Sequence, residues 1–330
     1  MLTFDPIVDE ALCVAYVAQT HARWHDGVAR PEWADCWEAA HGGLTADERR
    51  AAETLRDSIR GLGDGCRAIS HAAWRPHELA HEYREAFAVL KSRAAATVDA
   101  AREGMNAWRH ALGANRPPWF AAMCERLDAF FGIDEDVSVR VYLLPGPPRS
   151  NCGNGDMFVE RGATTLSCSG MPPDDEGLFL ILLHETAHSA HQPRVLSPLV
   201  AQRMNAATRA DLNAAFDESP ISVMGGDLSS VIGEYVIHSL IPFGALREAC
   251  GLESRDEHWR LLSERAASAL PDPDADHDAR YTAWVMWGAA RLLPMATEYV
   301  RDERPMDADF VDAALDAFAD IHREWRSSRR

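Results

Sequence analysis

The spacing of apolar residues predicts that the first 132 residues are mostly helical. Apolar positions there recur at three- and four-residue steps, the period of an amphipathic helix. The clearest example covers residues 76–112, in which Tyr83, Phe87 and Leu90 follow one another at these steps. We therefore predict a long helix over 76–112 within a helical N-terminal region, residues 1–132.

Two shorter signals mark helix starts in the same region. Thr45 stands three residues before Glu48, which is the spacing of a capping box at a helix N-terminus. A further periodic stretch, residues 119–131, follows two prolines and predicts a second helix. These signals support a layer of helices before the sheet.

The pattern changes at Val137, where the sequence Val-Ser-Val-Arg-Val-Tyr-Leu-Leu alternates and is rich in β-branched residues. Such a run predicts a strand, and it ends at a cluster of glycine and prolines that starts with Pro145. Two further strand signals, residues 157–160 and 163–169, follow on either side of a glycine. We predict a small β-sheet over residues 137–170.

Helical patterns return after the sheet. Residues 175–191 begin with acidic side chains, which suit the positive end of a helix, and continue as an apolar run. Residues 227–241 form a second strongly apolar helix, and further helices are expected over 255–328. The predicted fold is α+β and predominantly α-helical, with the sheet and these helices forming a second region, residues 133–330.

Composition narrows the classes of partner. The chain has 51 acidic and 33 basic residues and a formal net charge of −18, which repels nucleic acid and anionic membranes. It shows neither an apolar run long enough to span a bilayer nor the pattern of a signal peptide. The seven cysteines are scattered and lack CxxC spacing, as expected for reduced thiols. We therefore expect a cytoplasmic protein that binds neither nucleic acid nor membranes.

The strongest chemical signal is the HExxH pattern formed by His184, Glu185 and His188. Residues four apart share a helix face, so both imidazoles can bind one zinc ion. Glu185 lies about 100° further round the helix, beside the metal and outside its ligand set. There it can take a proton from water and pass it to a leaving group. The pattern predicts zinc-dependent hydrolysis, with a hydrogen-bonded His-Glu-His cluster as the alternative.

A catalytic zinc ion usually has three protein ligands, and Glu234 is the best candidate for the third. It is a lone carboxylate within an apolar helix, which is costly unless a cation faces it. Gly233 beside it would permit close approach of another backbone. His238, one turn later, is a candidate hydrogen-bond partner of Glu234 or a hydrogen-bond donor to the substrate. Alternatives are His191, which is about 10 Å from His184 along an α-helix axis, and Cys152, Cys168, Asp217 and Glu218.

Two histidines at positions 77 and 81 also have i, i+4 spacing. No glutamate or cysteine constellation accompanies them, so we expect solvated histidines on a helix face rather than ligands.

Hydrolysis also requires a residue near the metal that donates a hydrogen bond to the oxyanion formed in the reaction. The candidates for it are Tyr235, His238, His277 and Tyr281.

The HExxH pattern followed by a glutamate on a later helix resembles the gluzincin type of zincin metallopeptidase, over roughly residues 137–240. The third histidine of the metzincin type is absent from its required position. The resemblance implies one zinc ion held by His184, His188 and Glu234, a peptide or protein substrate, and a zincin-like core. It also implies that an edge strand, expected at residues 158–169, pairs with the extended substrate.

We therefore expect a metallopeptidase in which Glu185 is the general base and His238 and Tyr281 assist. A zincin scaffold alone does not establish peptidase activity. A zinc hydrolase acting on a non-peptide amide or small molecule is one alternative. A non-catalytic regulatory protein with a structural metal is the other, and it would provide a fourth protein ligand.

Overall fold

The computed structural model confirms a mostly helical α+β fold and divides the chain into two compact units. We call residues 3–117 and 138–189 the sheet unit, and residues 1–2, 118–137 and 190–330 the helical unit. This grouping does not follow the expected boundary after residue 132, because the N-terminal helices group with the sheet. The structure describes residues 2–23, 31–62, 65–147, 154–158, 163–204, 211–224, 227–253, 259–261, 264 and 277–328.

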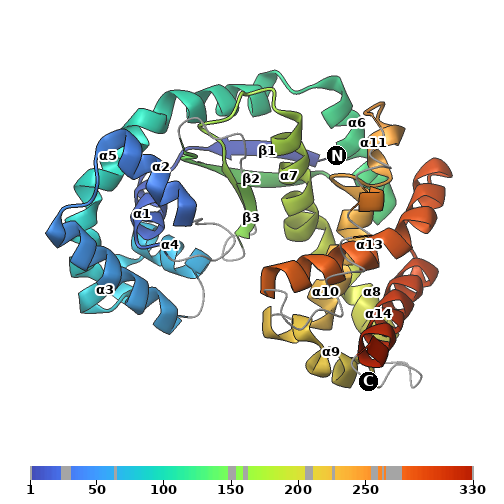
Figure 1. Ribbon diagram of the computed structural model, residues 1–330. Helices are drawn as coiled ribbons and strands as arrows, with labels where there is room; N and C mark the ends of the chain where they lie inside the picture. Colours follow the sequence, from blue (N-terminus) through green and yellow to red (C-terminus); the bar gives the residue numbers. More distant parts are fainter. Residues whose placement is uncertain are drawn as a thin grey trace. The chain divides into compact units, whose positions relative to one another are not determined.

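The N-terminal helices of the sheet unit pack on one another, with α5 in contact with α1 and α3, and α1 in contact with α4 (Figure 1). Helix α5 is the long helix expected from the sequence, but it starts at His81, after a separate 3-10 turn at Pro76–Glu78. Buried positions such as Tyr83, Leu90 and Ala94 follow the apolar period. The bounds are α1 Glu10–His21, α2 Pro31–His41, α3 Ala46–Leu62, α4 Gly65–Trp74 and α5 His81–Ala114.

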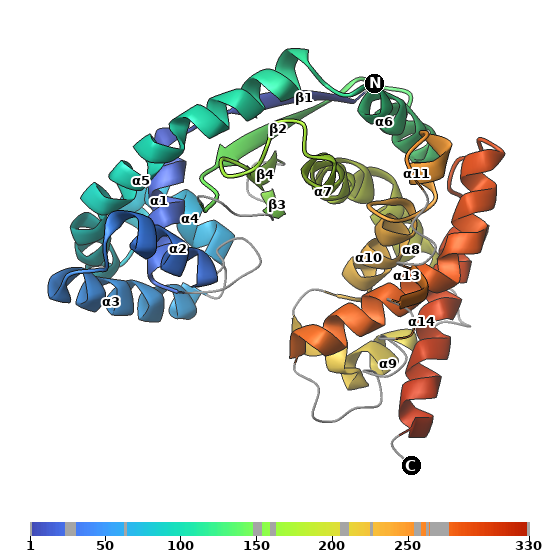
Figure 2. The ribbon, with the colours of Figure 1, turned by 45° about the horizontal axis from the view of Figure 1, so that its top comes forward.

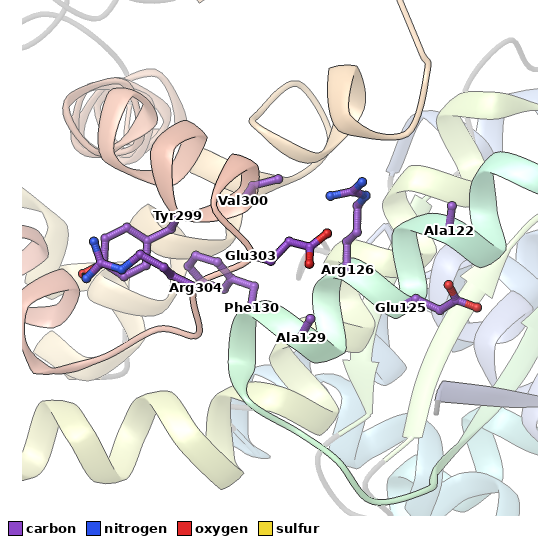
Figure 3. A pocket seen from close by; sticks show the side chains of 9 residues that line it. All are labelled: Ala122, Glu125, Arg126, Ala129, Phe130, Tyr299, Val300, Glu303 and Arg304. Carbon is purple, nitrogen blue, oxygen red and sulfur yellow. The ribbon is translucent and has the colours of Figure 1, made fainter.

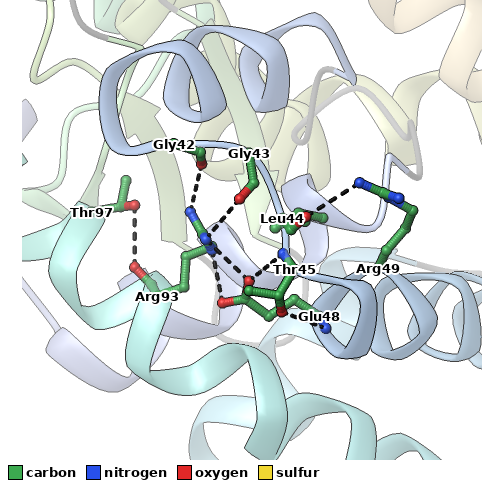
Figure 4. A network of polar contacts seen from close by, with 8 residues as sticks. All are labelled: Gly42, Gly43, Leu44, Thr45, Glu48, Arg49, Arg93 and Thr97. Atoms are coloured by element: carbon green, nitrogen blue, oxygen red, sulfur yellow. Dashed lines mark hydrogen bonds and ion pairs between the residues drawn. The ribbon is translucent and has the colours of Figure 1, made fainter.

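The expected capping box starts α3 and is joined to α5 by an ion pair (Figure 4). Thr45 N–H donates to Glu48 Oε2 at 2.8 Å, and Glu48 N–H donates to Thr45 Oγ1 at 3.2 Å. Arg93 of α5 donates to both carboxylate oxygens of Glu48, and also to the carbonyls of Gly42 and Gly43. The hydrogen bond from Arg93 lowers the pKa of Glu48 to about 2. This network fixes the start of α3 against α5.

The described strands form one four-stranded sheet in the order β1-β2-β4-β3. Strand β4 (Ala163–Ser167) pairs in parallel with β2 (Val137–Leu144) and antiparallel with β3 (Asn154–Phe158). The register places Leu144 opposite Ser167 and Phe158 opposite Ala163. The sheet expected over residues 137–170 is therefore present.

Two expectations about the strands were wrong. Residues 5–7 are not helical but belong to β1 (Leu2–Ile7), in which Leu2 and Phe4 are buried while Thr3 and Asp5 are exposed, the alternation of a half-buried strand. The segment 158–169 is not an edge strand either. It contains β4, which has a neighbour on both sides, so the described edge next to it is β3.

Helix α7 (Glu176–Thr186) packs against β3 and β4 within the sheet unit (Figure 2). The helix does not end at residue 191 as expected. It passes into a π-helical segment, Ala187–Leu196, and then into α8 (Ser197–Met204). The active helix of the sequence analysis is thus the first part of a longer helical run that leads from the sheet unit into the helical unit.

The helical unit has α10 packed on α13, and α13 packed on α14 (Figure 1). Helix α10 coincides closely with the helix expected over residues 227–241, and α13 and α14 lie within the expected C-terminal helices. None of the described helices has the length and apolar character required to cross a membrane. The bounds are α6 Pro118–Phe131, α9 Leu212–Glu218, α10 Leu228–Leu240, α11 Leu246–Ala249, α13 His277–Arg301 and α14 Ala308–Ser328.

A close contact between α10 and α13 gives a stability prediction. A Cβ atom added to Gly288 would lie 2.3 Å from the ring of Tyr235, which is fully buried. We expect Gly288→Ala to lower the free energy of unfolding by about 1–3 kcal/mol, because the ring has no room to move. Gly113→Ala is the control, since nothing lies within 4 Å of that position, and it should stabilise by about 0.5–1 kcal/mol. Equal urea midpoints for the two variants would contradict this packing.

A buried histidine at the end of α1 gives a prediction about pH. His21 is 1% exposed and neither ring nitrogen has a hydrogen-bond partner among the described protein groups. Burial, reinforced by the positive charge of Arg93, lowers the pKa of His21 from 6.5 to about 4. Between these values the unfolded chain binds a proton that the folded chain does not, so this site makes the protein less stable as the pH falls from 6.5 to 4.

The contribution of His21 to this loss should be about 2–3 kcal/mol. We expect His21→Phe to flatten the decline in urea stability measured between pH 7 and pH 4.5. His81→Gln, at a histidine whose side chain is 69% exposed, should leave the decline unchanged. A decline that is the same in His21→Phe and in the unmodified chain would contradict the assignment.

Candidate metal centre

The HExxH residues lie on a helix that is fixed by its cap and by its apolar face. Asp175 caps α7, with its carboxylate accepting from the Leu178 N–H at 2.8 Å. Phe179, Leu182 and Leu183 are completely buried, as the apolar run predicted. Because α7 buries these residues and packs on β3 and β4, its last turn has a defined orientation in the sheet unit.

The two histidines of the pattern point at each other. The Nε2 atoms of His184 and His188 are 3.1 Å apart, and the ring planes meet at 69°. His188 is 8% exposed and His184 is half-buried. Two imidazole nitrogens bound to one tetrahedral zinc ion at 2.0–2.1 Å would be about 3.3 Å apart. The pair therefore has nearly the separation that a shared metal ion requires.

The same separation also fits a hydrogen bond between the two rings. In that bond one Nε2 carries a proton and donates it in a hydrogen bond to the other Nε2. A metal ion instead requires both Nε2 atoms to be unprotonated. Both arrangements need the rings to converge as they do here. Metal binding is what distinguishes them.

The residue after His188 joins the helix to the sheet. Ser189 Oγ lies 3.1 Å from Thr164 Oγ1, and Thr164 belongs to β4. Thr186 and Ala187 are completely buried. This bond places the second histidine of the pattern at a fixed distance from β4. Glu185, between the two histidines, is half-buried.

His191 is held elsewhere and is not a ligand of the proposed site. Its Nε2 lies 2.9 Å from Asp128 Oδ1, and both side chains are buried. Asp128 comes from α6, and its other carboxylate oxygen accepts from the Leu2 N–H at 2.8 Å. No local pattern predicts this pair, because its two members are 63 residues apart.

Glu234 and His238 face each other on α10, within the helical unit. Glu234 Oε2 and His238 Nε2 are 3.4 Å apart, and each side chain is about one-fifth exposed, 22% and 21% respectively. Asp227 caps the helix by accepting from the Ser230 N–H at 2.9 Å. His238 is thus placed to orient the carboxylate of Glu234, as the sequence analysis suggested.

Helix α10 also lies beside the continuation of the HExxH helix. A Cβ atom on Gly233 would meet the side-chain amide of Gln192 at 2.5 Å, so a side chain takes the space that a backbone was expected to use. Ser229 Oγ donates to Ser197 Oγ at 3.4 Å, and α10 packs on α8. Gln192 is four residues after His188, one turn further along the same helical run.

The other candidate ligands have different surroundings. Cys168 is a fully buried free thiol whose pKa is raised by burial, while Cys152 lies outside the described residues. Asp217 and Glu218 belong to the last turn of α9. Glu218 is paired with His322 at 3.5 Å and with Arg326 at 3.4 Å.

The two histidines at positions 77 and 81 belong to different elements. His77 belongs to the 3-10 turn and His81 to α5, and their side chains are 78% and 69% exposed. Each has a glutamate partner of its own, Glu78 at 3.9 Å and Glu85 at 3.6 Å. The expectation of solvated histidines is consistent with these positions.

Among the candidate oxyanion donors, Tyr235 is excluded because its side chain is completely buried against α13. His277 and Tyr281 belong to the first turns of α13, but their side chains lie outside the described residues. His238 is the candidate whose side-chain position is known, and it faces Glu234.

A separate cavity of about 440 Å³ opens between α6 and the end of α13 in the helical unit (Figure 3). Its wall combines aromatic and charged residues, including Phe130, Tyr299, Arg126 and Arg304. Arg304 stacks on the Tyr299 ring at 4.0 Å and also donates to its hydroxyl. None of the candidate site residues whose side chains the structure describes lines this cavity.

Comparison with known proteins gives no assignment. No protein-family model matches the chain, and no curated protein or solved structure gives a significant match. The function is therefore argued from the geometry of these residues.

Proposed function

We propose that this protein is a zinc-dependent hydrolase of peptide bonds, with a zincin-like core. The observation that carries the proposal is the convergence of the His184 and His188 Nε2 atoms, 3.1 Å apart, at the end of a capped and buried HExxH helix. Imidazole nitrogens in this arrangement are typical zinc ligands. A glutamate between them, on the adjacent helix face, has the position of a general base.

Glu234 is proposed as the third protein ligand. It offers one carboxylate oxygen, as each histidine offers one ring nitrogen, and none of the three side chains is fully exposed. Gly233, the residue before Glu234, lies against Gln192, one turn beyond His188 on the same helical run. That contact favours α10 over the other candidate elements as the source of the ligand. The nitrogens and the carboxylate oxygen together form a donor set that suits zinc.

The protein residues divide the chemistry between them. Zinc, when bound, supplies positive charge that polarises the scissile carbonyl and makes water acidic enough to react. Glu185 accepts the proton from the attacking water and then gives it to the amine that leaves. His238 holds the Glu234 carboxylate in place through the contact between Nε2 and Oε2. Tyr281, near the start of α13, is the proposed donor to the oxyanion.

Strand β3 is proposed as the binding site for the substrate backbone. It is the edge of the described sheet on the side of α7, and α7 packs directly on it. An extended peptide that adds to such an edge gains main-chain hydrogen bonds whatever its sequence. This proposal replaces the edge strand that had been expected at residues 158–169.

The test of the proposal combines metal analysis with a peptide assay. Protein stripped by a chelator and reloaded should bind one zinc ion per chain and cleave a mixture of quenched fluorescent peptides. Stripping should abolish cleavage, and zinc should restore it. Failure to bind zinc at micromolar concentrations would contradict the metal site. Binding without cleavage of any peptide would contradict the peptidase and favour a non-peptide substrate or a regulatory role.

A further inference from the structure

A buried contact lies just beyond the proposed metal ligands on the same helical run. Asp128 of α6 binds His191 Nε2 through one carboxylate oxygen at 2.9 Å and the Leu2 N–H through the other at 2.8 Å. The side chain of His191 is completely buried and that of Asp128 is 7% exposed. Hydrogen bonds to a buried carboxylate are stronger than neutral ones, and leaving such a group unpaired is costly.

The ring of His191 is held in one orientation. Its Nδ1 has no hydrogen-bond partner among the described protein groups, and the ring lies 5.0 Å from the Phe131 ring. Because Nε2 faces the carboxylate, the proton sits on Nε2 and is donated to Asp128. Flipping the ring by 180° would put the carbon Cε1 in place of Nε2 and break this bond.

His191 belongs to the π-helical segment Ala187–Leu196, which also contains His188. Pro193 explains why the helix widens there, because a proline ring clashes with the carbonyl four residues earlier in an α-helix and supplies no N–H. Arg194 donates to the Ala190 carbonyl at 2.7 Å and satisfies one of the acceptors in this region. A π-helical turn is rare, and such turns are often found at functional sites.

We infer that Asp128 is a positioning residue for the proposed metal site. By holding His191, it fixes the π-helical turn and therefore the direction in which His188 presents its Nε2 atom. The inference rests on the proposed zinc-binding function and adds to it the contact between Asp128 of α6 and His191. Asp128 touches neither metal nor substrate in this account and acts through His191 alone.

The test compares zinc affinity in variants of this pair. His191→Leu removes the hydrogen bond while filling the space, and should weaken zinc binding by about 10- to 100-fold, the range for residues that orient metal ligands. His191→Gln retains an N–H that can reach Asp128 and should restore most of the affinity. Zinc dissociation constants come from competition with a chelator, and circular dichroism establishes that each variant is folded.

The matched control is Asp312→Asn in the same unit. Asp312 is also a paired carboxylate, because its Oδ1 accepts from Arg203 Nε at 2.9 Å. It belongs to α14, however, and not to α6. This change should lower stability without altering zinc affinity. The absorption spectrum of the cobalt-loaded protein provides a second readout, since it should shift in His191→Leu and remain unchanged in the control.

Folded His191→Leu with the zinc affinity and cobalt spectrum of the unmodified protein would overturn the inference while leaving the proposed function intact. If His191→Leu does not fold, Asp128→Asn takes its place, because an amide of nearly the same shape has one acceptor oxygen and cannot accept from both the Leu2 N–H and the His191 N–H. That variant should bind zinc more weakly than the unmodified protein, and equal affinity would overturn the inference. An unmodified protein that binds no zinc would overturn both proposals.

Discussion

Glu185→Gln should reduce kcat/KM for peptide hydrolysis by about 10²- to 10⁴-fold while the protein still binds one zinc ion, the range that a general base contributes. Glutamine has nearly the shape of glutamate but accepts no proton from water. It leaves the His184 and His188 rings and their convergence unchanged. The loss should therefore fall on the chemical step, not on metal binding.

The control for this prediction is Glu176→Gln, at the first turn of the same helix. That residue lies more than two turns away from the histidines and should leave kcat/KM unchanged. Zinc content is measured on the same samples that are assayed. Turnover in Glu185→Gln within a few-fold of the unmodified enzyme would contradict the base role, whatever the zinc content.

Glu234→Ala should weaken zinc binding by more than about 10²-fold, which exceeds the loss for residues that only orient a ligand. Removing one of the three proposed protein ligands would leave the metal with two imidazoles. It also removes the negative charge that offsets part of the charge of the ion. Glu234→Gln keeps an oxygen that can bind the metal but lacks the charge, so its zinc affinity should lie between those of the unmodified protein and Glu234→Ala. Competition with a chelator measures the affinity of each variant.

Two further variants provide zinc affinities with which the loss in Glu234→Ala can be compared. His238→Phe should weaken zinc binding by about 10- to 100-fold, because it removes the partner of the carboxylate but leaves the ligand in place. Glu218→Ala removes a half-exposed carboxylate of α9 that is paired with His322 and Arg326, and it should have no effect. Zinc affinity that is unchanged in Glu234→Ala would assign the third ligand to another residue.

The sequence predicted the local structure well where one periodic signal dominated. The steps between Tyr83, Phe87 and Leu90 identified α5, and the spacing of Thr45 and Glu48 identified the capping box that starts α3. The apolar run before His184 identified a buried helix. Each of these features depends on residues within a few positions of one another, so a single sequence contains the information.

Features that depend on distant residues were missed. Strand β1 has only two buried residues in alternation, Leu2 and Phe4, which is too short a pattern to separate from a helix start. Strand β4 was expected at the edge, but the parallel pairing with β2 places it inside the sheet. The pattern of hydrophobic residues does not specify which strands are neighbours, because that is set by long-range pairing.

The candidate site shows the same division. The convergence of His184 and His188 was expected from their spacing, which places both side chains on one helix face. The binding of His191 to Asp128, by contrast, could not be read from the sequence, nor could the widening of the helix after Thr186. Glu234 was selected because a carboxylate in an apolar helix is costly, and its contact with His238 is consistent with that reason.

Anomalous X-ray diffraction at the zinc absorption edge, from crystals grown with zinc, tests the central claim most directly. The account predicts one strong peak within bonding distance of the Nε2 atoms of His184 and His188 and of a carboxylate oxygen of Glu234, with one coordination position left for water. A map without a peak between the two imidazoles, in which their Nε2 atoms share only a hydrogen bond, would contradict it.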